Sequence, residues 1–172
     1  RLIYNENIPT RMELNNFLEI FGGVYEHSEW IAEEVYKTGL KDKHNSVEGL
    51  FSMMKNVVDN SSKEQKLNLL CAHPDLAGKL AINKNLTIES MSEQNSADLT
   101  NCHEDEFLKF QKLNYDYRNK FNFPFILAVR GYNRANILEI FSERINNSVE
   151  AEFAEAIRQV HRIALLRLKD IK

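Results

Sequence analysis

Apolar residues recur every three or four positions along most of the chain, which is the spacing of amphipathic helices. Between Thr10 and Tyr36 the pattern predicts two short helices that meet at the Gly22-Gly23 pair, because adjacent glycines weaken a helix. Further helices are predicted to begin near Asn45, to cover Lys63–Ala72 and Glu104–Phe121, to include Ile137–Ile145, and to begin again near Ser148. We therefore expect an all-α fold with no substantial sheet.

Two of the polar segments have the spacing of a capping box. In this spacing a Ser or Thr is followed three positions later by Glu, and each side chain bonds the other residue's backbone N–H group. The pairs are Ser61 and Glu64, and Ser90 and Glu93, whereas Asn45 with Glu48 three residues on indicates a helix start. For Glu93 the spacing offers a purely structural role, which is to close the start of its own helix.

Composition agrees with one compact globular domain over residues 1–172. With 43% hydrophobic and 27% charged residues, a chain of this length buries a core without metals or disulfides. Only 6 glycines and 3 prolines interrupt it, which favours long helices over many short strands. The net charge of -3 and the lack of a basic run argue against nucleic acid as a partner.

Cys71 and Cys102 are too few and too far apart for a disulfide framework or a paired-cysteine zinc site. No apolar stretch approaches the roughly 18 residues of a membrane span, and no targeting signal is visible. We expect an intracellular protein, cytoplasmic or peroxisomal, without a membrane partner. No metal site is predicted, since four histidines are isolated or in polar surroundings: His27, His44, His103 and His161.

His73 lies where the Lys63–Ala72 helix has to stop, because a residue before proline leaves the helical region and Pro74 cannot continue the ladder. A histidine held at such a bend, with Asp75 two residues on, suits proton transfer near neutral pH. The alternative is a histidine that caps the last carbonyls of its own helix. After Pro74 a short helical turn is expected over residues 76–80.

A second candidate feature follows Phe123-Pro124, where five apolar residues precede Gly131. An extended segment here would offer backbone N–H and C=O groups to a ligand. A small edge strand or the first turn of another helix is the alternative. The five residues are Phe125, Ile126, Leu127, Ala128 and Val129.

Arg167 lies on the apolar stripe of the last predicted helix, seven residues after Val160 and fourteen after Phe153. Burying a charge costs several kcal/mol unless it is paired, so a carboxylate of the protein or of a ligand should face it. The alternative is an arginine that extends outward to solvent from the helix C-terminus.

Together these stretches resemble the 2-oxo-4-hydroxy-4-carboxy-5-ureidoimidazoline (OHCU) decarboxylases of the urate-to-allantoin pathway. Four motifs in the right order carry the resemblance, and the opening segment from Phe21 to Trp30 also matches. The motifs are His73–Lys79, Ser90–Gln94 with Ala97 and Leu99, Leu113–Tyr117 with Phe121–Ile126, and Ile163–Leu168. Asn122 stands where the family usually has glycine, and Ser96-Ala97-Asp98 replaces a more glycine-rich stretch.

The resemblance implies an all-helical homodimer that acts on OHCU, releases allantoin and needs no cofactor or metal. It also implies a proton-transferring His73, an active-site Glu93 and a substrate-binding Arg167. The substrate-binding residues it implies are Pro74, Ser90, Met91, Ser92, Glu93, Gln94, Phe125, Ile126, Leu127, Ala128 and Val129. For Glu93 two roles are open, namely to bond hydroxyl or ureido groups of the substrate or to hold His73 in one tautomer.

The chemistry that the resemblance implies is loss of carbon dioxide from a ring carbon, which leaves a charge held as an enolate near hydrogen-bond donors. A non-catalytic helical module that binds a protein partner is the competing interpretation. A hydrolase of a related ureide, with His73 as the base for water, is a second enzyme hypothesis. The decarboxylase hypothesis predicts that His73, Glu93 and Arg167 converge on one pocket, whereas the binding-module hypothesis predicts that they scatter.

Overall fold

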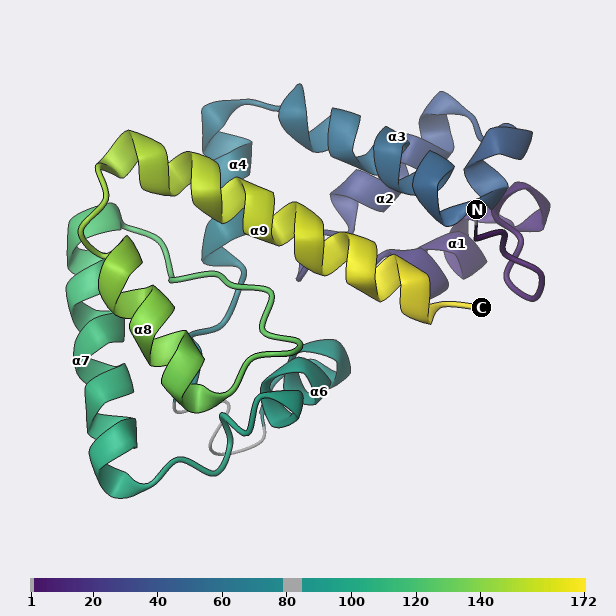
Figure 1. Cartoon of the computed structure of the whole chain (residues 1–172). Coiled ribbons are helices and arrows are strands. Elements are labelled where there is room, and N and C mark those ends of the chain that lie inside the picture. Colours follow the sequence, from purple (N-terminus) through teal and green to yellow (C-terminus); the bar gives the residue numbers. More distant parts are fainter. Residues whose placement is uncertain (1, 79–84) are drawn as a thin grey trace. The chain divides into compact units, whose positions relative to one another are not determined.

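A computed structural model describes residues 2–78 and 85–172 of the chain (Figure 1). Within these residues there are eight α-helices and no strand beyond one isolated antiparallel bridge between Ile3 and Ser46. The α-helices are α1 (Leu14–Phe21), α2 (Trp30–Thr38), α3 (Val47–Asp59), α4 (Lys63–Cys71), α6 (Ile88–Ser96), α7 (Glu104–Phe121), α8 (Arg134–Arg144) and α9 (Val149–Asp170). The all-α prediction is confirmed.

The chain divides into two compact units. The first combines Arg1–Ala72 with His161–Lys172, and the second is His73–Val160. Helix α9 contributes residues to both, because the boundary falls between Val160 and His161. That residues 1–172 form a single domain stays a prediction.

In the first unit α2 packs against α1 and α3, and apolar faces of these helices form the core. Short 3-10 helices at Pro9–Arg11 and Asp42–Asn45 precede α1 and α3. Near the N-terminus the Tyr4 hydroxyl donates to the Leu168 carbonyl at 2.8 Å. Fully buried core residues of this unit are Phe17, Val35, Leu50, Met54, Val58, Leu70, Ala164 and Leu168.

Three predicted helix starts are wrong by one to three residues. Helix α3 is capped by Ser46, since the Asn45 amide bonds Thr10 instead. Helix α4 is capped by Ser62 rather than by Ser61, whose hydroxyl donates back to the end of α3. Helix α6 starts after Thr87, whose hydroxyl accepts the Ser90 N–H at 3.2 Å. Ser90 and Glu93 therefore lie inside α6, and Glu93 does not close its start. Local capping rules predict the region where a helix starts, but they do not predict which of several adjacent polar residues caps it.

The second unit has an aromatic core around Tyr117 of α7. Helix α7, with the predicted bounds Glu104–Phe121, runs beside α8 (Figure 1). The Tyr117 ring lies 4.5 to 5.8 Å from four other rings, in mostly edge-on contacts. Its hydroxyl donates to Glu152 of α9, and burial raises the pKa of Tyr117, which keeps this donor protonated. The four rings are those of Phe121, Phe123, Phe125 and Phe141.

Residues Phe125 to Val129 form neither helix nor strand, as the extended-segment interpretation predicted. All five are buried, with exposed fractions of 1% to 6%. The predicted turn over residues 76–80 is described only in part, because Lys79 and Leu80 lie outside the described residues. None of the described helices combines the length and apolarity needed to cross a lipid bilayer.

His161 was predicted to be isolated or in polar surroundings, and the structure places its ring between two polar groups. In the first unit its Nδ1 lies 2.8 Å from the Tyr25 hydroxyl, and its Nε2 lies 3.0 Å from a carboxylate oxygen of Asp59. A neutral ring that accepts from Tyr25 and donates to Asp59 satisfies all three groups. Burial lowers the pKa of His161, and the hydrogen bond to Asp59 opposes this shift without cancelling it.

The lowered pKa of His161 gives a testable pH dependence of stability. Below pH 6.5 the unfolded chain takes up a proton at this histidine more readily than the folded chain does, so unfolding becomes easier as pH falls. We expect His161→Gln to lower the free energy of unfolding by about 1–2 kcal/mol at pH 7.5. It should also flatten the decline in stability between pH 7 and pH 5, measured by urea unfolding. The slope that remains should include His44, whose pKa burial also lowers. An unchanged slope would contradict the assignment.

Candidate active site

The loop that follows His73 is held by side chains along its backbone. The carbonyls of Asp75, Leu76 and Ala77 each accept a side-chain N–H, at 3.1, 3.0 and 3.2 Å respectively. The Ala77 N–H in turn donates to a side-chain oxygen at 3.0 Å. Ala77 has a φ of 51°, in the left-handed region that non-glycine residues rarely adopt. Because a loop in this conformation forms no ladder of its own, these bonds fix its course.

One face of α7 supplies three of the side chains that hold this loop. Gln111 donates to the Ala77 carbonyl, Asn114 donates to the Leu76 carbonyl, and Arg118 pairs with the Asp75 carboxylate at 2.9 Å. Positions 111, 114 and 118 are three and four residues apart, so they lie on one helix face. Among the residues that the structure describes, the buried Asn114 Oδ1 atom has no hydrogen-bond partner. This role was not predicted from the sequence for any of the three residues.

Gln94 of α6 is the fourth side chain, and it bonds the loop twice. Its amide oxygen accepts from the Ala77 N–H, and its amide nitrogen donates to the Asp75 carbonyl. Gln94 is 2% exposed, so neither bond competes with bulk water. The segments that carry His73 and Glu93 are therefore joined within the second unit. Gln94 was predicted to bind substrate, and in the structure its amide holds the loop after His73.

The other predicted residues on α6 differ in exposure. Ser90 is 4% exposed and shares the buried side of α6 with Gln94, whereas Ser92 is exposed. Glu93 and Met91 are half-buried. A helix turns by 100° per residue, so Ser92 points away from the side that Ser90 and Gln94 share. A contact of Ser92 with substrate stays a prediction.

His73 is 6% exposed and lies two residues after the end of α4, at the first position of the second unit. Half-buried Pro74 follows it directly. Burial and the fixed loop restrict the orientations open to the imidazole ring, as proton transfer in one direction requires.

Arg167 belongs to the first unit, and there it faces a carboxylate of the protein. Its Nη1 atom lies 3.5 Å from a carboxylate oxygen of Glu26 and donates to the Gly23 carbonyl at 3.0 Å. Arg167 is 4% exposed, so the alternative of an outward-extending side chain is wrong. That His73, Glu93 and Arg167 converge on one pocket stays a prediction.

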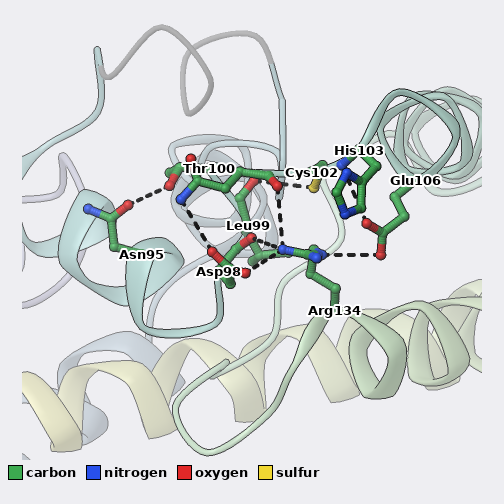
Figure 2. A network of polar contacts seen from close by, with 9 residues as sticks. Asn95, Asp98, Leu99, Thr100, Cys102, His103, Glu106 and Arg134 are labelled. Carbon is green, nitrogen blue, oxygen red and sulfur yellow. Dashed lines mark hydrogen bonds and ion pairs between the residues drawn. The ribbon is translucent and has the colours of Figure 1, made fainter.

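A polar network fixes the connection from α6 to α7 (Figure 2). Arg134, at the start of α8, donates to the Asp98 carbonyl at 3.0 Å and pairs with the carboxylates of Asp98 and Glu106. Asp98 has a φ of 60° and follows α6 closely. The C-terminal end of α6 is thus tied to the first turns of α7 and α8.

Within residues 2–78 and 85–172 no group of three or more His, Cys, Asp or Glu side chains is placed to hold a metal ion. His161 lies beside a carboxylate and has both ring nitrogens engaged with protein groups.

Comparison with known proteins shows the family. A family model described as OHCU decarboxylase matches residues 10–169. A 2-oxo-4-hydroxy-4-carboxy-5-ureidoimidazoline decarboxylase of Haloferax volcanii is 38% identical over 160 residues, which are 93% of this chain and 91% of that protein. The chain belongs to the OHCU decarboxylase family. The resemblance drawn from the four motifs is thereby confirmed.

Two solved structures are similar to this family member. The crystal structure of an (S)-allantoin synthase is 33% identical with a TM-score of 0.72, and the match covers 94% of this chain. This chain spans about half of that protein, since the match covers 52% of it. The crystal structure of an OHCU decarboxylase in the presence of (S)-allantoin has a TM-score of 0.68 at 21% identity, with 86% of this chain and 93% of that one covered. At this identity it shows the shared fold alone.

The role of Gln94 in this family member can be tested at the atoms it bonds. We expect Gln94→Leu to expose the Ala77 N–H to hydrogen exchange, because its acceptor is lost while the surroundings stay apolar. One buried and one half-buried backbone group lose their partner, so the free energy of unfolding should fall by about 2–4 kcal/mol. Exchange by NMR and urea unfolding measure both effects. Gln65→Leu, at the exposed cap of α4, serves as the control. Unchanged protection of Ala77 in Gln94→Leu would refute the assignment.

Proposed function

We propose that this chain is an OHCU decarboxylase, which converts OHCU to (S)-allantoin and carbon dioxide in urate degradation. The family match over residues 10–169 carries the proposal. It is supported by the 38% identity to the Haloferax volcanii decarboxylase over nearly the whole of both chains. No observation favours the protein-binding module or the ureide hydrolase as a second candidate.

The reaction breaks the bond between ring carbon 4 and the carboxylate carbon. The electron pair of that bond forms a double bond between carbon 4 and carbon 5, and the electrons of the ring C=N bond move to its nitrogen, which takes up a proton from solvent. Carbon dioxide leaves, and the product of this step is an enol in which carbon 4 still bears its hydroxyl group. Loss of the hydroxyl proton and addition of a proton at the neighbouring ring carbon then give allantoin. The face on which this proton arrives sets the configuration of the product, so one fixed proton donor suffices for a single enantiomer.

We assign the proton transfer to His73. Two features support this assignment, namely the sequence motif from His73 to Lys79 and the loop directly after His73 that four side chains hold. A histidine in a fixed place delivers its proton to one face of a bound ring, and a mobile one would not. Pro74 shapes the same bend and is proposed to contact the substrate.

Glu93 is proposed to accept a hydrogen bond from the hydroxyl group on carbon 4. A carboxylate near a departing carboxylate repels it, whereas a carboxylate that binds the hydroxyl draws away the proton that has to leave. Ser90 and Met91 lie on the same helix as Glu93 and are proposed to line the site beside it.

Phe125 to Val129 are proposed to face the substrate with backbone groups that stabilise the developing charge. Arg167 is proposed to bind an anionic group of the substrate, since a guanidinium matches a carboxylate in two places. Glu26, the partner of Arg167 in the first unit, would hold that guanidinium in one orientation. An Arg167 that bound the departing carboxylate too tightly would stabilise the ground state as well as the transition state.

Three further properties are proposed on the strength of the resemblance. The first is that the reaction needs no cofactor, because the substrate ring itself takes up the electron pair. The second is that the chain acts as a homodimer, and the third is that it does so in the cytoplasm or peroxisome. A chelator that left the rate unchanged, and a dimer in sedimentation, would agree with the first two. A rate that fell with chelator and returned with a divalent metal would contradict cofactor independence.

The proposal predicts optically active allantoin. OHCU is generated in place from urate by urate oxidase and hydroxyisourate hydrolase, and circular dichroism follows the product. We expect a rapid signal with the wild type and a rate at least about 100-fold lower with His73→Asn, as for loss of a proton-transferring group. Glu93→Gln, which keeps an acceptor but not a base, should lower the rate by a smaller factor.

His27→Asn is the matched control for the histidine substitution. His27 is exposed and has a φ of 47°, which asparagine tolerates well. It should retain the wild-type rate. A wild-type trace that matched the protein-free reaction would refute the decarboxylase proposal.

A further inference from the structure

The segment from Phe125 to Val129 is buried backbone without regular structure. Its side chains are 1% to 6% exposed, and it lies between α7 and α8. Buried backbone of this kind has neither a helix nor a sheet to satisfy its polar groups, so side chains, turns or water have to do so. Two side chains from other elements of the second unit meet it, one at a carbonyl and one at an N–H.

Arg144, at the end of α8, bonds the carbonyl. Its Nη1 atom donates to the Ile126 carbonyl at 2.7 Å, and its guanidinium lies 4.4 Å over the Phe125 ring. The rest of the guanidinium is fixed by Glu152, which accepts from Nη2 at 2.7 Å and is fully buried. Asn147 also donates to this carboxylate, at 3.1 Å. Arg144 is thus a rigid donor, because its other contacts leave it little freedom.

Gln159 of α9 bonds the N–H. Its side-chain oxygen accepts from the Ala128 N–H at 3.0 Å, across 31 residues of sequence. It is a neutral side chain and is half-buried. The bonds to Ile126 and Ala128 are two residues apart along the segment. Together they fix how far the segment can slide along its own axis and how far it can rotate about that axis.

We propose that Gln159 and Arg144 are positioning residues of the decarboxylation, which set the register of the segment from Phe125 to Val129 against the substrate. The inference rests on the proposed function, since it takes this segment as the one that faces the reacting ring. It also limits which backbone groups of the segment can stabilise the developing charge. The Ala128 N–H is engaged by Gln159, so the donors to the developing charge are other groups of the segment.

Gln159 offers the sharper test, because one neutral hydrogen bond can be removed with little change of shape. Gln159→Met keeps the length of the side chain and loses the acceptor, whereas Gln159→Glu keeps an acceptor oxygen. Arg158→Met is the matched control, since Arg158 is the adjacent residue, is exposed, and pairs only with Glu155 of its own helix at 3.4 Å among the contacts described.

We expect Gln159→Met to lower kcat about tenfold with KM changed less than twofold, as for an interaction that matters in the transition state. Gln159→Glu should recover at least half of the lost rate. Arg144→Lys, which can bond Glu152 or the Ile126 carbonyl but not both in the same way, should lower kcat by at least as much as Gln159→Met. Amide exchange at Ala128 should rise in Gln159→Met and stay unchanged in Arg158→Met.

Binding of (S)-allantoin by calorimetry separates positioning from loss of folded protein, because the stoichiometry reports the folded fraction. A Gln159→Met enzyme with wild-type kcat would overturn the inference. So would a loss that Gln159→Glu shares in full, or one matched by an equal fall in stoichiometry. A wild type that makes no optically active allantoin would instead refute the proposed function, and the inference would fall with it.

Discussion

Buried backbone that forms neither helix nor sheet has to find its hydrogen-bond partners outside a regular ladder, largely in side chains, and the second unit depends on this constraint. Its described residues include two such segments, the loop over residues 75–77 and the segment over residues 125–129. Gln94 and Asn114 are among the side chains that hold the first, and Arg144 and Gln159 hold the second. Both segments were singled out by motifs of the family, so the helices act as a frame that gives irregular backbone a defined course.

The polar residues of this frame serve a purpose that apolar packing cannot. Apolar contacts are non-directional, so they exclude water without specifying which carbonyl or N–H points where. Each side-chain bond to backbone contributes only about 1 kcal/mol net, but its loss leaves a buried group unsatisfied at a cost of about 1–3 kcal/mol. The loss of one partner costs more in the buried pair of Arg144 and Glu152, because it leaves the other as an unpaired buried charge. Such groups define one arrangement more than they add stability.

Much of the fold could be predicted from one sequence. The bounds of α7 and the break after it follow from apolar spacing and from Pro124, and the all-α class follows from the scarcity of glycine and proline. Helix starts were less predictable, because Ser61 and Ser62 compete for one cap and the outcome depends on the preceding helix.

The side chains that fix the loops could be predicted only in part. The burial of Arg144 could have been predicted, since it lies on the buried side of α8 with Ile137 and Phe141. Arg167 lies on the apolar stripe of its own helix in the same way. The partner of Gln159, by contrast, is 31 residues away in a segment without period. Periodicity says which face of a helix is buried but not which distant backbone atom that face meets.

The side chains of the loop after His73 determine little of the loop's conformation. The bonds that hold Leu76 and Ala77 involve their backbone atoms and not their side chains, and the side chains at the other end of those bonds lie 17 to 38 residues further along the chain. Transplanting residues 73–78 into another helical scaffold would therefore carry the histidine without its placement. A designer who wished to move this arrangement would have to graft the polar faces of α6 and α7 first, and could then choose the loop sequence with considerable freedom.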